Sequence, residues 1–103
     1  MQSAVQNKLS LISLLKANSQ KLKSYGVANL SIFGSFIKGK PTANSDVDLL
    51  VDFVPGKKSY DNFMDLSFFL EDLLGRKVEV VTPESLSKYI GPYILKEAEH
   101  VAI

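Results

Sequence analysis

The sequence has 103 residues and a formal net charge of +1, with 46% hydrophobic and 22% charged residues. This length fits one domain around one hydrophobic core, and this charge gives no indication of nonspecific binding to nucleic acid or to a membrane surface. The absence of cysteine excludes disulfides and thiolate metal sites. No apolar run approaches the ~20 residues of a membrane span, and the first residues lack the apolar block of a signal peptide. We therefore expect a single domain over residues 1–103, located in the cytoplasm.

Residues 3–25 are predicted to form a helix. Apolar residues recur there with helical spacing, at Val5, Leu9, Ile12 and Leu15. Gly26 follows at the position where a left-handed residue commonly ends a helix. We expect this helix to cover one face of a sheet.

Residues 28–33 alternate as a strand does, with Ala28, Leu30 and Ile32 on one face and Asn29, Ser31 and Phe33 on the other. Gly34 and Ser35 end the strand, one helical turn follows, and residues 39–45 form a loop by their Gly, Pro and Asn content. A Gly-Ser pair between a strand and a helix offers backbone N–H groups and a hydroxyl to an anion. This turn is therefore a candidate phosphate site.

Residues 46–53 are predicted to form a second strand. One face of it is apolar, with Val47, Leu49, Val51 and Phe53. Asp46 and Asp48 leave the opposite face, roughly 7 Å apart along the chain. Two adjacent carboxylates repel each other and lose hydration, and a divalent cation can offset that cost.

A helix is predicted over residues 61–74, with Gly75 at its end and Arg76 as a helix-end charge. Residues 77–82 form a third strand that carries Glu79. If this strand lies beside the second one, Glu79 projects from the same face as Asp46 and Asp48. Three carboxylates would then converge near the Gly34–Ser35 turn, which suits magnesium and phosphoryl or nucleotidyl transfer.

The last part of the chain is predicted to be helical. One helix begins at Thr82 and reaches about residue 89, Gly91–Pro92 breaks it, and a final helix covers residues 93–99. The order helix, strand, strand, helix, strand, helix predicts an α/β (α+β) fold with helices packed on a small mixed sheet.

Gly34–Ser35, ten residues, and then Asp46-Val47-Asp48 resemble the signature of the polymerase-β-type nucleotidyltransferase superfamily. The longer segments Phe-Gly-Ser-Phe-Ile-Lys-Gly and Ser-Asp-Val-Asp-Leu-Leu-Val resemble its minimal nucleotidyltransferase (MNT) branch, which includes antitoxins. The spacing is fairly specific because strands flank it, whereas a lone Asp-x-Asp would be weak.

The resemblance implies a polymerase-β-like fold and the transfer of a nucleoside monophosphate, with AMP from ATP expected, to an acceptor hydroxyl. Gly34, Ser35 and Ser45 would hold the nucleoside triphosphate. Asp46 and Asp48 would ligate magnesium, with two ions expected, and Glu79 would be the third acidic residue, as metal ligand and as base for the acceptor. The resemblance also implies a HEPN-domain partner in a toxin–antitoxin pair, and adenylylation of that partner.

One position departs from the family pattern, because Glu79 stands where the branch usually has Asp. The extra methylene moves the carboxylate by roughly 1.3–1.5 Å, and catalysis is sensitive to a displacement near 1 Å. Two hypotheses therefore stay open. The first is a magnesium-dependent nucleotidyltransferase that modifies a protein. The second is a catalytically weak or inactive nucleotide-binding antitoxin that neutralises a HEPN partner by direct binding.

About 100 residues leave little chain for a separate acceptor domain, so we expect a partner protein to complete the cleft. Apolar residues on the first and last helices are the candidates for that contact, namely Leu11, Tyr89, Tyr93 and Ile94. The sequence leaves open whether the chain forms a homo-oligomer or a hetero-oligomer, and which base the nucleotide carries.

Overall fold

The computed structural model describes residues 4–39, 41–42 and 44–103. Its centre is a four-stranded sheet in the order β3-β2-β1-β4. The strands are β1 (Val27–Phe33), β2 (Val47–Phe53), β3 (Val78–Val81) and β4 (Glu99–Val101). β1 pairs antiparallel with β2 and with β4, whereas β2 and β3 are parallel. The predicted mixed sheet with packed helices is confirmed.

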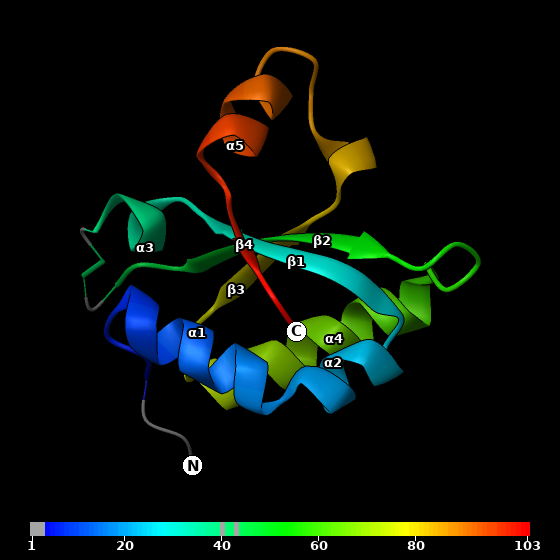
Figure 1. The fold of residues 1–103 in the computed structure, drawn as a ribbon, viewed down its shortest axis with the longest axis horizontal. Helices are drawn as coiled ribbons and strands as arrows, with labels where there is room; N and C mark the ends of the chain where they lie inside the picture. The colour runs from blue at the N-terminus through cyan, green and yellow to red at the C-terminus, as the bar shows by residue number, and fades with distance from the viewer. Residues whose placement is uncertain (1–3, 40, 43) are drawn as a thin grey trace.

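Most of the helical structure lies on one side of this sheet. The helices are α1 (Lys8–Ala17), α2 (Ser19–Ser24), α3 (Ser35–Lys38), α4 (Tyr60–Leu74), the 3-10 helix η1 (Pro83–Ser85) and α5 (Gly91–Glu97). Figure 1 shows α1, α2 and α4 together beneath the sheet, whereas α5 and η1 project above it. No helix in the described ranges is long and apolar enough to cross a membrane.

The hydrophobic core fills the space between the sheet and the α1, α2 and α4 layer. The fully buried side chains from these elements include Leu11, Leu15, Leu22, Leu66, Leu70 and Leu74. They meet Val47, Leu49 and Val51 of β2, each of which has 0% exposure. The predicted apolar face of the second strand is therefore the core face, and the acidic face points away from it.

The N-terminal prediction of one long helix is wrong, since the chain forms α1 and α2 with a break at Asn18. The Asn18 side-chain amide donates to Leu14 O at 2.8 Å, so this residue caps the end of α1. Ser3, the predicted first residue, lies outside the described residues. The strand that follows begins at Val27. An irregularity between Val27 and Asn29 leaves Ala28 exposed, so it does not share the buried face of Leu30 and Ile32 as predicted.

The C-terminal prediction also needs correction. The expected helix from Thr82 to residue 89 is only the short η1, and Gly91–Pro92 begins α5 instead of breaking a helix. Proline fits there because the first turn of a helix does not use its backbone N–H groups. α5 ends at Glu97, and the chain then adds the unpredicted edge strand β4 beside β1.

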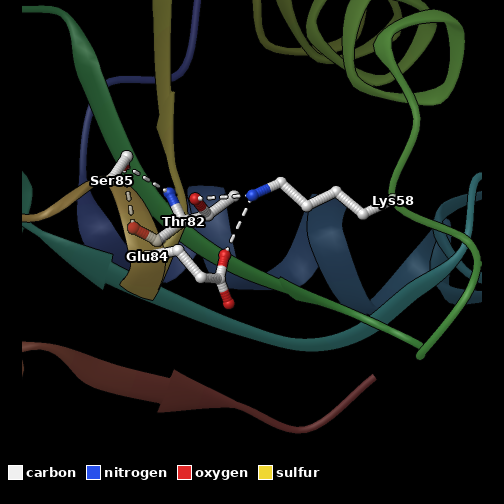
Figure 2. Close-up of polar contacts among 4 residues, drawn as sticks. All are labelled: Lys58, Thr82, Glu84 and Ser85. Atoms are coloured by element: carbon white, nitrogen blue, oxygen red, sulfur yellow. Dashed lines mark hydrogen bonds and ion pairs between the residues drawn. The ribbon is translucent and has the colours of Figure 1, made fainter.

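The connection after β3 is held by a polar network at the C-terminal ends of β2 and β3 (Figure 2). Lys58 Nζ donates to Glu84 Oε2 at 3.0 Å and to Thr82 Oγ1 at 3.4 Å. Thr82 N donates to Ser85 Oγ at 3.1 Å, and Ser85 Oγ donates to Thr82 O at 2.8 Å. The hydrogen bond from Lys58 is the main cause that lowers the pKa of Glu84. This network holds the start of η1 against the loop that follows β2.

Candidate active site

The turn that ends β1 approaches β2 so closely that only glycine fits. Phe33 pairs with Asp48, and Gly34 follows with φ 77° as the N-cap of α3. A Cβ on Gly34 would overlap the Asp48 carboxylate and would lie 3.1 Å from its Cγ. Gly34 is therefore needed both for its left-handed backbone and for the missing side chain. The Gly34–Ser35 turn and Asp48 are direct neighbours, as the motif predicts.

Asp48 and Glu79 face each other across the parallel strands β2 and β3. Burial of the carboxyl group is the main cause that raises the pKa of Asp48 to about 6. The charge of Glu79, a hydrogen bond between the two carboxyl groups and the charge of Asp46 raise it further. This hydrogen bond requires a proton between the two oxygens. The pair is therefore an acidic site in which a bound cation can take the place of that proton.

Asp46 lies just before β2 instead of within it, and it is exposed. The prediction that the second strand begins at Asp46 is wrong by one residue. Asp46 is near enough for its charge to raise the pKa of Asp48. No three Asp, Glu, His or Cys residues of the described chain are gathered as closely as a metal centre requires. The predicted convergence is thus a close pair, Asp48 and Glu79, with Asp46 outside it.

This donor set still fits magnesium. The ion prefers hard oxygen ligands, and proteins often bind it through one or two carboxylates while water and substrate phosphates supply the rest. The Asp48–Glu79 pair presents only carboxylate oxygens, and the backbone of the Gly34 turn lies beside it. Asp48 and Glu79 are therefore the residues that would hold such an ion, with Asp46 joining when a cation relieves the repulsion among the three.

Ser45 has partners within its own loop. Thr42 N donates to Ser45 Oγ at 2.8 Å, Thr42 Oγ1 and Ser45 Oγ lie 3.2 Å apart, and Ser45 N donates to Thr42 O at 3.1 Å. These bonds connect Thr42 and Ser45 in the turn directly before Asp46. Residues 40 and 43 of this loop lie outside the described residues. The binding of nucleotide by Ser45 stays a prediction.

Two side chains reach this region that sequence reasoning did not assign to it. Gly34 N donates to Glu97 Oε1 of α5 at 3.3 Å, so a carboxylate occupies the N–H that an incoming phosphate would use. Arg76 donates to the carbonyl oxygens of Thr42 and Ser45, which goes beyond the role of a helix-end charge. The Gly34–Glu97 contact spans 63 residues, so no local pattern could have indicated it.

Comparison with known proteins agrees with this geometry. Residues 11–101 match the family model described as nucleotidyltransferase domain. The protein adenylyltransferase MntA of Thermococcus cleftensis is 38% identical over 92 residues, which cover 86% of this chain and 90% of that protein. A solved structure of a provisionally assigned minimal nucleotidyltransferase superposes with a TM-score of 0.80 at 26% identity, covering 98% of this chain and 100% of the other.

A third similarity is to a chain from a crystal structure of a toxin–antitoxin with AMP-PNP. It has a TM-score of 0.63 at 22% identity, covers 94% of this chain and 73% of that chain, and shows a shared fold. The match to the family model spans most of the described sheet and helices, and it includes Gly34–Ser35, Asp46, Asp48 and Glu79. The predicted family and enzyme class are thus confirmed, and the chain belongs to the nucleotidyltransferase-domain family, with the fold of its minimal members.

Proposed function

We propose that this protein is a magnesium-dependent nucleotidyltransferase that transfers AMP from ATP to a hydroxyl group of a partner protein in the cytoplasm. The observation that carries the proposal is the contact between the Gly34 turn and the Asp48–Glu79 pair. It joins a backbone N–H group suited to phosphate with carboxylates suited to a divalent cation. The adenylyltransferase activity named for the Thermococcus relative supports AMP as the transferred group.

In this proposal all the residues of the site belong to a single domain of residues 1–103. Gly34 and Ser35 would hold the triphosphate, with Ser45 nearby, and Asp48 and Glu79, joined by Asp46, would hold two magnesium ions. Magnesium, when bound, neutralises charge that develops on the phosphate oxygens. Glu79 accepts the proton of the acceptor hydroxyl. The hydroxyl oxygen then bonds to the α-phosphorus, the bond from that phosphorus to the bridging oxygen breaks, and pyrophosphate leaves.

The acceptor that we propose is a HEPN-domain partner. The relative crystallised as a toxin–antitoxin with AMP-PNP supports a companion protein and a nucleotide together. Leu11 is fully buried and drops out of the predicted contact surface, because its side chain belongs to the core. Tyr89 and Tyr93 are 75% and 76% exposed, and Ile90 beside them is 59% exposed. These three residues are the better candidates for the contact.

The test uses the purified protein, its HEPN-domain companion, labelled ATP and magnesium. Transfer of the label to the companion is expected, and Asp48→Asn should reduce its rate by at least about 100-fold. Asp52→Asn is the matched control, since it makes the same change of charge on the same strand but four residues farther along than Asp48, the register partner of Glu79. Equal loss in both variants, or transfer without magnesium, would contradict the proposal.

One observation favours a second candidate, a nucleotide-binding antitoxin that acts by occlusion. Glu79 carries the longer side chain at the position of the third acid, and it faces Asp48 across the parallel strands β2 and β3. A tight complex with the companion and no transferred label would support occlusion. Faster transfer by Glu79→Asp would show that the chemistry is present and limited by the reach of this side chain.

A further inference from the structure

Arg76 lies between α4 and β3, directly after Gly75, which ends α4 in a left-handed conformation. Its Nε donates to Val5 O at 2.6 Å. Its Nη1 donates to Thr42 O at 2.8 Å and to Ser45 O at 2.9 Å. The guanidinium also lies 5.3 Å from the centre of the Phe36 ring of α3. One side chain therefore contacts the N-terminal segment, the loop before Asp46 and the helix that follows the Gly34–Ser35 turn.

These contacts bear on the two halves of the site. Thr42 and Ser45 are the ends of the turn that leads into Asp46, and both their carbonyl groups accept from the same nitrogen of Arg76. The next residue, Lys77, accepts from Val47 N through its carbonyl oxygen at 3.0 Å. The chain on either side of Asp46 is thus held by residues 76 and 77. Phe36, under the guanidinium, directly follows Ser35.

The chemistry of the side chain suits this task. A guanidinium is planar, always charged and presents several N–H donors in fixed directions, so it can bond carbonyl groups from separate segments at once. A lysine ammonium is a compact point charge and cannot reproduce this arrangement with the same geometry. Hydrogen bonds from a charged donor are also stronger than neutral ones.

We infer that Arg76 is a positioning residue for the nucleotidyltransferase site, which fixes the loop carrying Asp46 against the Gly34–Ser35 turn. This inference rests on the proposed function. Because Asp46 is exposed and lies outside the strand, its place relative to Asp48 depends on the loop that precedes it. Without Arg76 that loop loses the two bonds that hold its ends, and the metal ligands lose their common geometry.

Two variants test the inference. Arg76→Lys keeps the positive charge and much of the stem, and Arg76→Met keeps the stem alone. Lys58→Met is the matched control, because Lys58 also bridges two segments but does so at the other end of β3. Each protein is titrated with Mn²⁺ in the presence of a non-hydrolysable ATP analogue, and hydrogen exchange is followed at the amides of Ser45 and Val47.

Both Arg76 variants should bind Mn²⁺ at least about 10-fold more weakly than the wild type, a loss that corresponds to about 1.4 kcal/mol. The amides of Ser45 and Val47 should exchange faster while those of β1 stay protected, and Lys58→Met should change neither readout. The magnesium concentration for half-maximal transfer should rise in parallel. If Arg76→Met does not fold, Arg76→Lys carries the test, since it retains the charge and the packing.

Wild-type affinity for Mn²⁺ and normal exchange in Arg76→Lys would overturn the inference. A uniform rise in exchange over the whole sheet would also overturn it, since that pattern marks a general loss of stability. If the wild type itself neither binds Mn²⁺ with nucleotide nor transfers AMP, the proposed function fails, and faster exchange at Ser45 and Val47 still reports whether Arg76 holds the loop.

Discussion

The two faces of β2 have opposite effects on the stability of the fold. One face places Val47, Leu49 and Val51 in the core with 0% exposure, where each side chain adds to the free energy of unfolding. The other face places Asp48 against Glu79, where burial and like charge disfavour the ionised form. The same strand thus stabilises the protein with one face and destabilises it with the other. The acidic face of β2 therefore does not support the fold, which agrees with the binding role proposed for Asp48 and Glu79.

The largest expected effect is on the core face. Leu49→Ala should lower the free energy of unfolding by about 2–5 kcal/mol, because it leaves a cavity among fully buried side chains. Leu50→Ala is the matched control on the other face, outside the core cluster, and should cost clearly less. Urea denaturation of both variants measures the difference. Equal losses of unfolding free energy would show that the two faces of β2 do not differ in their contribution to stability.

An intermediate effect of opposite sign is expected from Asp48→Asn. The raised pKa of Asp48, about 6, means that the folded protein holds this proton more tightly than the unfolded chain, so the ionised group costs stability above that pH. With allowance for solvent access, the variant should gain about 1–2 kcal/mol at pH 7.5. The gain should shrink as the pH falls through 6 towards the ordinary value of 3.8, and disappear below it.

Urea denaturation at pH 7.5 and pH 4.5 checks this prediction, with Asp52→Asn as the variant of equal charge change on the same strand. A loss of stability in Asp48→Asn at pH 7.5 would show that the carboxylate supports the fold. The stabilised variant should at the same time lose AMP transfer, which would place stability and activity in direct conflict at one side chain.

The smallest effect is expected at Glu97. Removal of its carboxylate in Glu97→Ala frees Gly34 N and takes a negative charge from the path of the triphosphate. The KM for ATP should fall about 2- to 5-fold, while the free energy of unfolding should change by less than about 0.5 kcal/mol. Glu84→Ala removes the same charge beside Lys58 and is the control. A higher KM in Glu97→Ala would mean that Glu97 supports the turn instead of competing with the phosphate.

Sequence patterns of short range predicted β1, β2 and β3 and the turn at Gly34–Ser35. The alternation in residues 47–53 gave the core face, and the glycine and serine at positions 34 and 35 marked the turn next to it. The sequence left the neighbourhood of the second and third strands as a condition, and the structure fulfils it with β2 and β3 parallel, as the helix between them allows. The motif then placed Asp48 beside that turn, as the register confirms.

Other features could not be predicted because they depend on single residues or distant contacts. Apolar residues recur with helical spacing on both sides of Asn18, so the periodicity did not show the break between α1 and α2. β4 has three residues, too few for an alternation to be recognised, and its pairing with β1 spans most of the chain. The bonds of Arg76 go to backbone carbonyl groups, which every residue has and no sequence pattern marks.

The hydrogen bond from Gly34 to Glu97 connects the Gly34–Ser35 turn to α5, and if nucleotide binds at this turn as proposed, thermodynamic linkage makes the connection reciprocal. A ligand that displaces Glu97 releases the end of α5. A protein that draws α5 away leaves the turn open to an anion, and the two affinities change by the same factor. A companion seated on Tyr89 and Tyr93 would therefore govern nucleotide entry, and the nucleotide would govern how long the companion stays.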